Sequence, residues 1–257
     1  MSDTEPPVTP GPLRRVVRRT LNPTVRYRVR QRIMETPVLA EAFMRVNPGT
    51  AISRITPQTR LVLDGFPRSG NSFARAAFQV ANGDSVAIAT HAHTPRVIRL
   101  GVRRNLPVIV LIRDPARAIA SILQFAEPDF TPTAIDAYAR YYRAVLPLVD
   151  RVVVAPFETV IADFGAVIRD CNARFGTDFA ALEPTTENEA VALARVDEEA
   201  RRVAGPEHFD AVVPRPVATR TDPADLLARL DASARRRLDV ARDVHDRVLR
   251  AAAASAG

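Results

Sequence analysis

Two glycines frame a turn near residue 65, between a short apolar run and a helical pattern. Gly65 and Gly70 are followed by Asn71 and Ser72, which is the frame of a nucleotide phosphate loop with asparagine at the usual lysine position. Glycines let the backbone approach a phosphate, and N–H groups at the start of the following helix bind the anion. Because the chain contains no lysine, Arg68 inside the turn must supply the positive charge. The same pattern is also compatible with a simple strand-to-helix connector.

A second candidate binding group lies where another apolar run, residues 108–112, gives way to a helical pattern. Arg113 ends the run, Asp114 and Pro115 are typical of a helix start, and Ser121 follows Arg113 by eight residues. Arginine offers a two-pronged donor to phosphate, and α/β sheets bind ligands at the carboxyl ends of their strands. The alternative is that Arg113 pairs with a neighbouring acid and Ser121 only faces a helix groove.

The third chemical feature is a pair of histidines after a short apolar segment, residues 86–89. Thr90 and His91 follow this segment directly, and His93 would share a face with His91 in an extended backbone. An imidazole can accept a proton near neutral pH, so either histidine can serve as a general base. Either can equally be a structural residue whose hydrogen bonds are satisfied within the fold.

Together these features resemble the PAPS-dependent sulfotransferases, and we take the chain as a bacterial-type member. In that family the donor loop runs aromatic residue, proline, lysine or arginine, serine, glycine and a small polar residue, and residues 66–73 read FPRSGNSF. The resemblance implies that the nucleotide donor PAPS, or its product PAP, is bound without a metal. Its 5′ end would be held by Pro67, Arg68, Ser69, Gly70, Asn71 and Ser72, and its 3′-phosphate by Arg113 and Ser121. Arg68 would also stabilise charge on the leaving group.

The resemblance also implies a catalytic base. Many members of the family carry a histidine after a strand, about 22 residues before the arginine that binds the 3′-phosphate. His91 lies 22 residues before Arg113, so it is the expected base. His93 remains the alternative, since it lies only two residues further along.

Two further segments match the family more loosely. Residues 151–158 resemble its strand ending in Tyr-Glu-Asp, and we expect Glu158 to be structural or helix-capping. Residues 213–220 lie where the family closes a loop over the 3′-phosphate, but they lack its glycines. Arg215, or else Arg220, would then contact that phosphate. The likeness covers residues 61–179 and fades on both sides.

Short apolar segments alternate with helical patterns, which predicts an α/β fold with a parallel sheet covered on both faces. We expect a three-layer sandwich with a P-loop-like strand, loop and helix, and a helical C-terminal region. The expected strands are residues 61–63, 86–89, 108–112 and 151–155, and the expected helices are residues 71–80, 115–125, 133–149, 157–175, 187–203 and 222–250. The expected parts are a basic, proline-rich extension at 1–57, partly disordered at 1–12, and a sulfotransferase domain at 58–257.

The net charge of +7 is concentrated near the N-terminus, because residues 1–57 hold ten arginines and four acidic residues. This distribution disfavours a nucleic-acid-binding protein, although arginines and tyrosines are interleaved at residues 138–143. At residues 13–32, arginines alternate with aliphatic residues around Pro23, which is typical of a solvated arm or of peripheral contact with an anionic membrane. The sequence has no transmembrane run and no signal-peptide pattern, so we expect a cytoplasmic protein.

The function predicted from these features is transfer of a sulfuryl group from PAPS to a hydroxyl or amine. The expected acceptor is a carbohydrate, a glycolipid or a small metabolite, and a homodimer is left open. The four histidines and one cysteine show no metal-ligand spacing. The main alternative is a P-loop phosphotransferase or NTPase, which Asn71 disfavours. Such an enzyme would also need a strand-end aspartate for Mg²⁺, and Asp114 is better explained as a helix cap.

Overall fold

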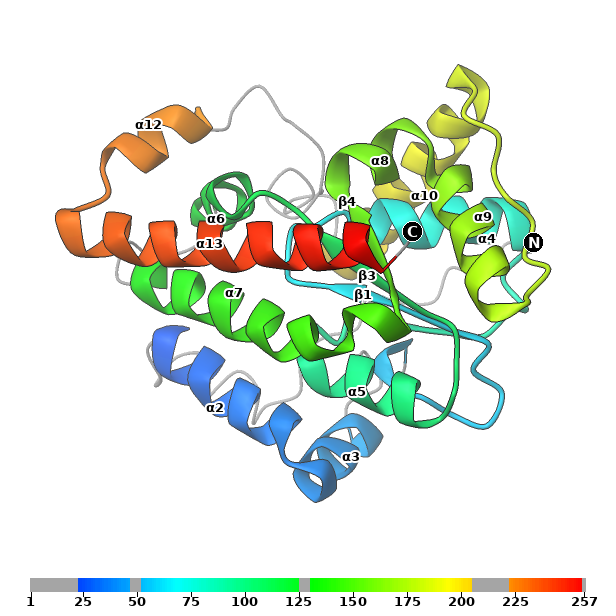
Figure 1. Cartoon of the computed structure of the whole chain (residues 1–257), viewed down its shortest axis with the longest axis horizontal. Coiled ribbons are helices and arrows are strands. Elements are labelled where there is room, and N and C mark those ends of the chain that lie inside the picture. The colour runs from blue at the N-terminus through cyan, green and yellow to red at the C-terminus, as the bar shows by residue number, and fades with distance from the viewer. Residues whose placement is uncertain (1–22, 47–51, 125–129, 205–221, 256–257) are drawn as a thin grey trace.

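The computed structural model describes residues 23–46, 52–124, 130–204 and 222–255 (Figure 1). Within them lies a parallel sheet of four strands in the order β2-β1-β3-β4. The strands are β1 (Leu61–Gly65), β2 (Ile88–Thr90), β3 (Val108–Ile112) and β4 (Val153–Pro156). The parallel sheet is confirmed. The expected strand at residues 86–89 is displaced toward the histidines, and that at 151–155 begins at Val153.

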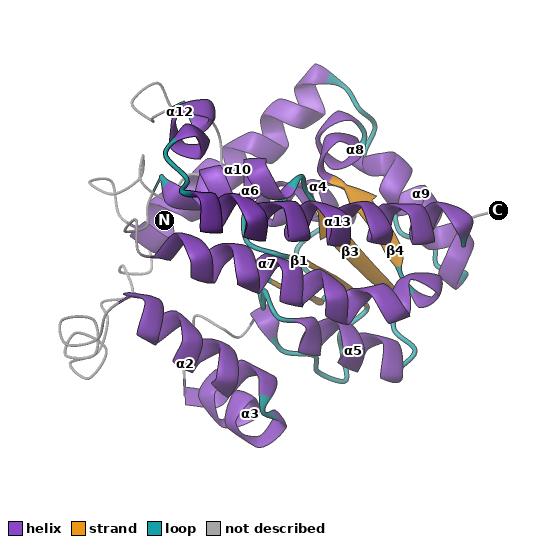
Figure 2. Cartoon of the chain, turned by 60° about the vertical axis from the view of Figure 1, so that its left-hand side comes forward, coloured by secondary structure: helices purple, strands orange, loops and turns teal. Residues whose placement is uncertain are grey.

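Side chains of the buried strands alternate between two hydrophobic cores, one on each face of the sheet. Val62 and Val110 contribute to the core under α5 (Pro95–Arg103), α6 (Pro115–Leu123), α7 (Thr131–Val145) and α13 (Ala232–Ala254). Leu63 and Leu111 contribute to the core under α4 (Asn71–Asn82), α8 (Phe157–Ala162), α9 (Phe164–Phe175) and α10 (Thr186–Ala204). Figure 2 shows α7 and α13 lying across one face of the strands. The three-layer arrangement is therefore confirmed.

Two expected helices are divided by aspartates that cap a new helix. The helix expected at residues 157–175 is broken at Asp163, whose side chain accepts a hydrogen bond from Ala166 N at 2.8 Å and so begins α9. The helix expected at residues 222–250 is divided into α12 (Pro223–Ala228) and α13, and Asp231 caps α13 by accepting from Ala234 N at 2.7 Å. A side-chain oxygen that satisfies a free N–H stabilises a helix start, even inside a continuous helical pattern.

The helix expected at residues 133–149 also ends early, for a different reason. α7 ends at Val145 and continues as the 3₁₀ helix η3 (Leu146–Arg151). Pro147 lies in this segment and has no N–H to donate to the preceding turn, so the α-helical bonding pattern stops there.

The N-terminal segment contains two helices, α2 (Pro23–Glu35) and α3 (Pro37–Val46). Pro23 begins a helix rather than interrupting a run, as a proline without a hydrogen-bonding N–H can do at the first position. Tyr27 packs edge-on against Phe130 at 5.0 Å between ring centroids, and Arg28 Nη2 donates to Thr133 Oγ1 at 3.1 Å. The division at residues 57 and 58 stays a prediction, and residues 1–12 lie outside the described residues.

Among the described helices, none has the length and apolar character needed to cross a bilayer.

Candidate functional site

The glycine-framed turn leads from β1 into α4, and both glycines are required by their surroundings. A Cβ on Gly65 would lie 2.4 Å from the carbonyl oxygen of Leu111, so only glycine permits this approach of β1 to β3. Gly70 has φ +92°, and a Cβ there would meet the Phe157 ring at 3.2 Å. Arg68 also has a positive φ, of 68°, which is rare for a residue with a side chain. The turn is a P-loop-like connection, as expected.

Asn71 holds this loop in shape. Its Nδ2 donates to the carbonyl oxygen of Phe66 at 3.1 Å across the loop. The N–H of Ala74 bonds to the carbonyl of Gly70 at 2.9 Å, and Gly70 provides no side-chain cap. The N–H groups at the start of α4, residues 71–73, thus precede the first α-helical bond and are oriented for an anion.

Arg68 connects the two predicted phosphate-binding motifs. Its Nε donates to Ser121 Oγ at 2.8 Å, and its carbonyl oxygen accepts from Arg113 Nη1 at 3.0 Å. The Arg113 guanidinium lies over the Phe157 ring, 4.0 Å from the centroid, and its Nε is buried without a hydrogen-bond partner. Burial lowers the pKa of Arg113, because desolvation disfavours its charged form. Residues 53 positions apart therefore form one cationic cluster at the carboxyl ends of β1 and β3.

Two tyrosines of α7 hydrogen-bond to the backbone around this cluster. The Tyr142 hydroxyl donates to the carbonyl of Leu111 at 2.7 Å and accepts from the N–H of Phe66 at 3.4 Å. The Tyr138 hydroxyl donates to the carbonyl of Arg113 at 2.6 Å. Both rings are fully buried, and their hydroxyls fix the loop and the strand end, which the sequence did not indicate. Periodicity gives the buried face of a helix and not the partners of its polar atoms.

His91 lies against the phosphate loop. Its Nε2 is 3.3 Å from Ser72 Oγ and its Nδ1 is 3.1 Å from Thr90 Oγ1. Its backbone has φ 57°, in the left-handed region. Burial lowers the pKa of His91 to about 3, and the nearby charges of His93 and Arg75 add to the shift.

His93 is held on the other side, beside the fully buried Asp64. Its Nδ1 is 2.8 Å from the carbonyl oxygen of Gly65, and because a carbonyl only accepts, Nδ1 carries the proton and Nε2 the lone pair. The His93 N–H donates to Asp64 Oδ2 at 3.0 Å, and the N–H of Gly65 donates to Asp64 Oδ1 at 2.9 Å. Burial raises the pKa of Asp64 to about 8 and lowers that of His93 to about 4. Asp64 is a site residue that sequence reasoning missed, because it lies within a buried strand.

A small cavity adjoins His93. Its walls are Phe66 and His93 at the loop, Ala137, Arg140 and Tyr141 of α7, Pro95, and Tyr27, Gln31 and Glu35 of α2. The Tyr141 hydroxyl is buried and makes no hydrogen bond. A buried donor without a partner costs free energy and marks a place where a polar group can bind.

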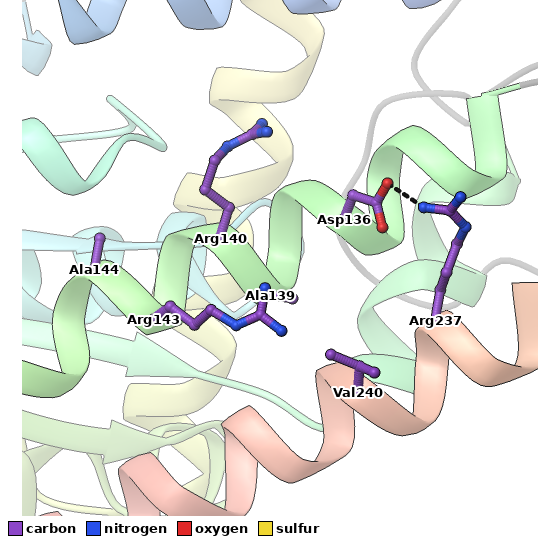
Figure 3. A pocket seen from close by; sticks show the side chains of 7 residues that line it. All are labelled: Asp136, Ala139, Arg140, Arg143, Ala144, Arg237 and Val240. Atoms are coloured by element: carbon purple, nitrogen blue, oxygen red, sulfur yellow. Dashed lines mark hydrogen bonds and ion pairs between the residues drawn. The ribbon is translucent and has the colours of Figure 1, made fainter.

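A larger groove of about 720 Å³ lies elsewhere, between α7 and α13 (Figure 3). Asp136 and Arg237 face each other across it with 2.5 Å between Oδ2 and Nη1. None of the predicted site residues lines this groove. Its size therefore gives no reason to move the candidate site away from the loop.

The structure gives positions for two of the remaining predicted residues, and two others lie outside the described residues. Glu158 is in the first turn of α8 and lies 3.8 Å from Arg117, at the surface. Asp114 caps α6 by accepting from Arg117 N at 2.8 Å, so it is the helix cap that we expected. Arg215 and Arg220 lie outside the described residues. Within the described part of the chain, no cluster of histidine, cysteine and carboxylate side chains could hold a metal ion.

Comparisons with known proteins give likenesses among solved structures. No protein-family model matches the chain, and no curated protein matches it. Among solved structures, the chain is similar to the crystal structure of mouse sulfotransferase SULT7A1 complexed with PAP. The two share 13% sequence identity over 77% of this chain and 92% of that chain, with a TM-score of 0.45. A bacterial-type membership stays a prediction.

Proposed function

We propose that the protein is a sulfotransferase that transfers a sulfuryl group from PAPS to an acceptor hydroxyl or amine. The observation that carries this proposal is the cluster of Arg68, Arg113 and Ser121 beside the start of α4. Two cations, a hydroxyl and a set of free N–H groups suit a ligand with two separate anionic groups. The buried Arg113 Nε without a partner supports the same interpretation.

The donor would lie across this cluster. Arg68 and the N–H groups of residues 71–73 would bind its 5′ end, while Arg113 and Ser121 would bind its 3′-phosphate. When bound, PAPS supplies the sulfuryl group and a nucleotide phosphate as leaving group. Arg68 would stabilise the negative charge that develops on that leaving group.

The proton of the acceptor would pass to one of the two imidazoles. Spacing in the sequence names His91, whereas the contacts favour His93. The Nε2 of His91 is near Ser72, so this ring contacts the loop that would hold the donor. His93 has its tautomer fixed by Gly65, which leaves the lone pair on Nε2, and its ring lines the small cavity with Tyr141. A carbohydrate, a glycolipid or a small metabolite remains our proposal for the acceptor.

The rival P-loop NTPase receives no support from the loop. Asn71 is turned back onto Phe66, so no cation reaches out from the position that lysine occupies in that class. Asp64 is buried within β1 and hydrogen-bonded to backbone N–H groups, and Asp114 caps α6. Neither carboxylate is placed for Mg²⁺.

Calorimetry with PAP and AMP tests the donor assignment. We expect PAP to bind without Mg²⁺ and about 10- to 150-fold more tightly than AMP, since a charge-assisted hydrogen bond contributes about 1.5–3 kcal/mol. An Arg113→Ala variant should lose this preference, while Arg117→Ala, a neighbouring surface arginine, should keep it. Equal affinities for PAP and AMP would refute the donor assignment. Incubation with radiolabelled PAPS and a lipid or metabolite extract would then identify the acceptor by the label it acquires.

A further inference from the structure

The basic charge of the chain belongs to one short segment. Residues 13–32 contain eight arginines and no acidic residue, whereas the whole chain has a net charge of only +7. The second half of this segment forms most of α2. The acidic side chains of α2 and α3 are near arginines: Glu35 lies 3.9 Å from Arg140, and Glu41 lies 2.7 Å from Arg54. The positive charge of this region is therefore not cancelled by its own carboxylates.

One face of α2 is fixed against the body of the protein. Tyr27 packs on Phe130, Met34 is buried, and Arg28 bonds to Thr133. α2 and α3 lie side by side at one edge of the molecule in both Figure 1 and Figure 2. Since the inner face of α2 is determined by these contacts, its opposite face must meet solvent or a partner.

That outer face carries exposed aliphatic side chains. Val25 and Val29 are 44% and 46% exposed and lie one helical turn apart, so they share a face. Val38 and Leu39, at the start of α3, are 77% and 52% exposed. Four of the seven large hydrophobic residues found exposed in the described chain thus lie within α2 and α3. Exposed aliphatic groups among arginines are typical of surfaces that bind the interface of a bilayer.

We propose that the outer face of α2 and the start of α3 form a docking surface for an anionic lipid bilayer. Arg30 and Arg32, which are exposed on α2, attract anionic headgroups, and Val25, Val29, Val38 and Leu39 enter the boundary between headgroups and acyl chains. A nucleic acid would use the arginines but would leave the aliphatic groups in water. The exposed arginine and aliphatic side chains of α2 together therefore favour lipid.

This surface is one helix away from the candidate site. The inner face of α2 contributes Tyr27, Gln31 and Glu35 to the cavity beside His93. A protein docked through the outer face of α2 would hold that cavity next to the bilayer. The docking proposal itself does not depend on the donor assignment, because it concerns residues outside the phosphate-binding cluster.

Vesicle sedimentation with the full-length protein tests the proposal. At about 0.1 M salt, we expect binding to phosphatidylcholine vesicles that contain phosphatidylglycerol, and weaker binding to phosphatidylcholine alone. Replacing both valines of α2, Val25→Ser with Val29→Ser, should weaken binding at least about tenfold, because aliphatic burial is lost. Replacing Arg32 by Gln should weaken it about fivefold, as expected for one charge near an anionic surface.

The chain offers a matched control. Val191 and Val240 are 44% and 45% exposed but lie on α10 and α13, so Val191→Ser with Val240→Ser should bind like the parent protein. Circular dichroism verifies folding, and Val38→Ser with Leu39→Ser gives a second test if the first variant misfolds. Failure of the parent protein to sediment with anionic vesicles would overturn the proposal. Equal binding by the α2 variant and the control would also overturn it. A third contrary result would be a protein that does not bind vesicles but binds a DNA duplex tightly, with the same affinity after the valine substitutions.

Discussion

The two sides of the phosphate loop differ in the charge of their side chains. On one side, Arg68, Arg113 and Ser121 lie at strand-to-helix junctions and form a cationic cluster whose members contact one another. On the other side, His91 and His93 follow β2 in a turn where both have a left-handed backbone, and burial favours their neutral form. The first side is charged and suits an anion, while the second is neutral and suits proton transfer. A backbone outlier of this kind costs about 1–3 kcal/mol, so two of them in one turn point to a function.

The largest expected effect separates the two histidines. Replacement of the true base by alanine should reduce acceptor-dependent turnover about 10²- to 10⁴-fold, because a positioned base contributes that much to the rate. The contacts favour His93→Ala as the inactive variant, and the spacing argument favours His91→Ala. Turnover of both variants, with circular dichroism to verify folding, decides between them.

Donor binding serves as the internal control for this pair. His93→Ala should leave PAP affinity nearly unchanged, whereas His91→Ala should weaken it modestly through loss of the contact with Ser72. If both variants turn over normally, the histidine side has no catalytic role and the contrast between the two sides fails, while the donor assignment stands.

The next effect concerns the cationic side. Arg68→Ala should slow single-turnover transfer about 10²- to 10³-fold, the usual effect of removing a group that stabilises developing charge. It should weaken PAP binding by less, because the contact strengthens only as the leaving group gains charge. Arg117→Ala is the control, since that arginine lies on the neighbouring helix α6 and pairs with Glu158 at the surface. An Arg68→Ala variant with parental transfer rates would mean that another group supplies the catalytic cation.

The same contrast explains what sequence could predict. The cationic side follows from local patterns: a glycine pair, a strand end and a residue eight positions further along define it, and all three positions meet in the structure. The parallel sheet and its two covered faces follow from alternating apolar runs and helices. The breaks at Asp163 and Asp231 did not follow, because a capping aspartate in a helical pattern is indistinguishable from a surface residue.

The histidine side could be predicted only in part. Spacing located two candidate bases, but their difference depends on partners far away in sequence. The carbonyl of Gly65 fixes the tautomer of His93, and the carboxyl of Asp64 lies next to it, buried by the sheet. Tyr141 lines the cavity with an unpaired hydroxyl. None of these contacts has a signature along the chain.

The smallest expected effect is the pH dependence of turnover. The pKa of His91 is lowered to about 3 and that of His93 to about 4, both by burial, so each imidazole is neutral well below its ordinary range. A neutral base remains competent as the pH falls, and turnover at saturating PAPS and a non-ionising alcohol should change less than about twofold between about pH 8 and about pH 5. An exposed histidine of ordinary pKa would instead lose about 30-fold over that range. At the upper end, Asp64 ionises near its raised pKa of about 8, and the carboxylate beside His93 then increases the proton affinity of the imidazole, which stays neutral at that pH and so remains available as a base. A steep fall in turnover with a midpoint near about pH 6.5 would show that the proton passes to a solvated histidine, and the neutral, buried side of the loop would then have no part in the reaction.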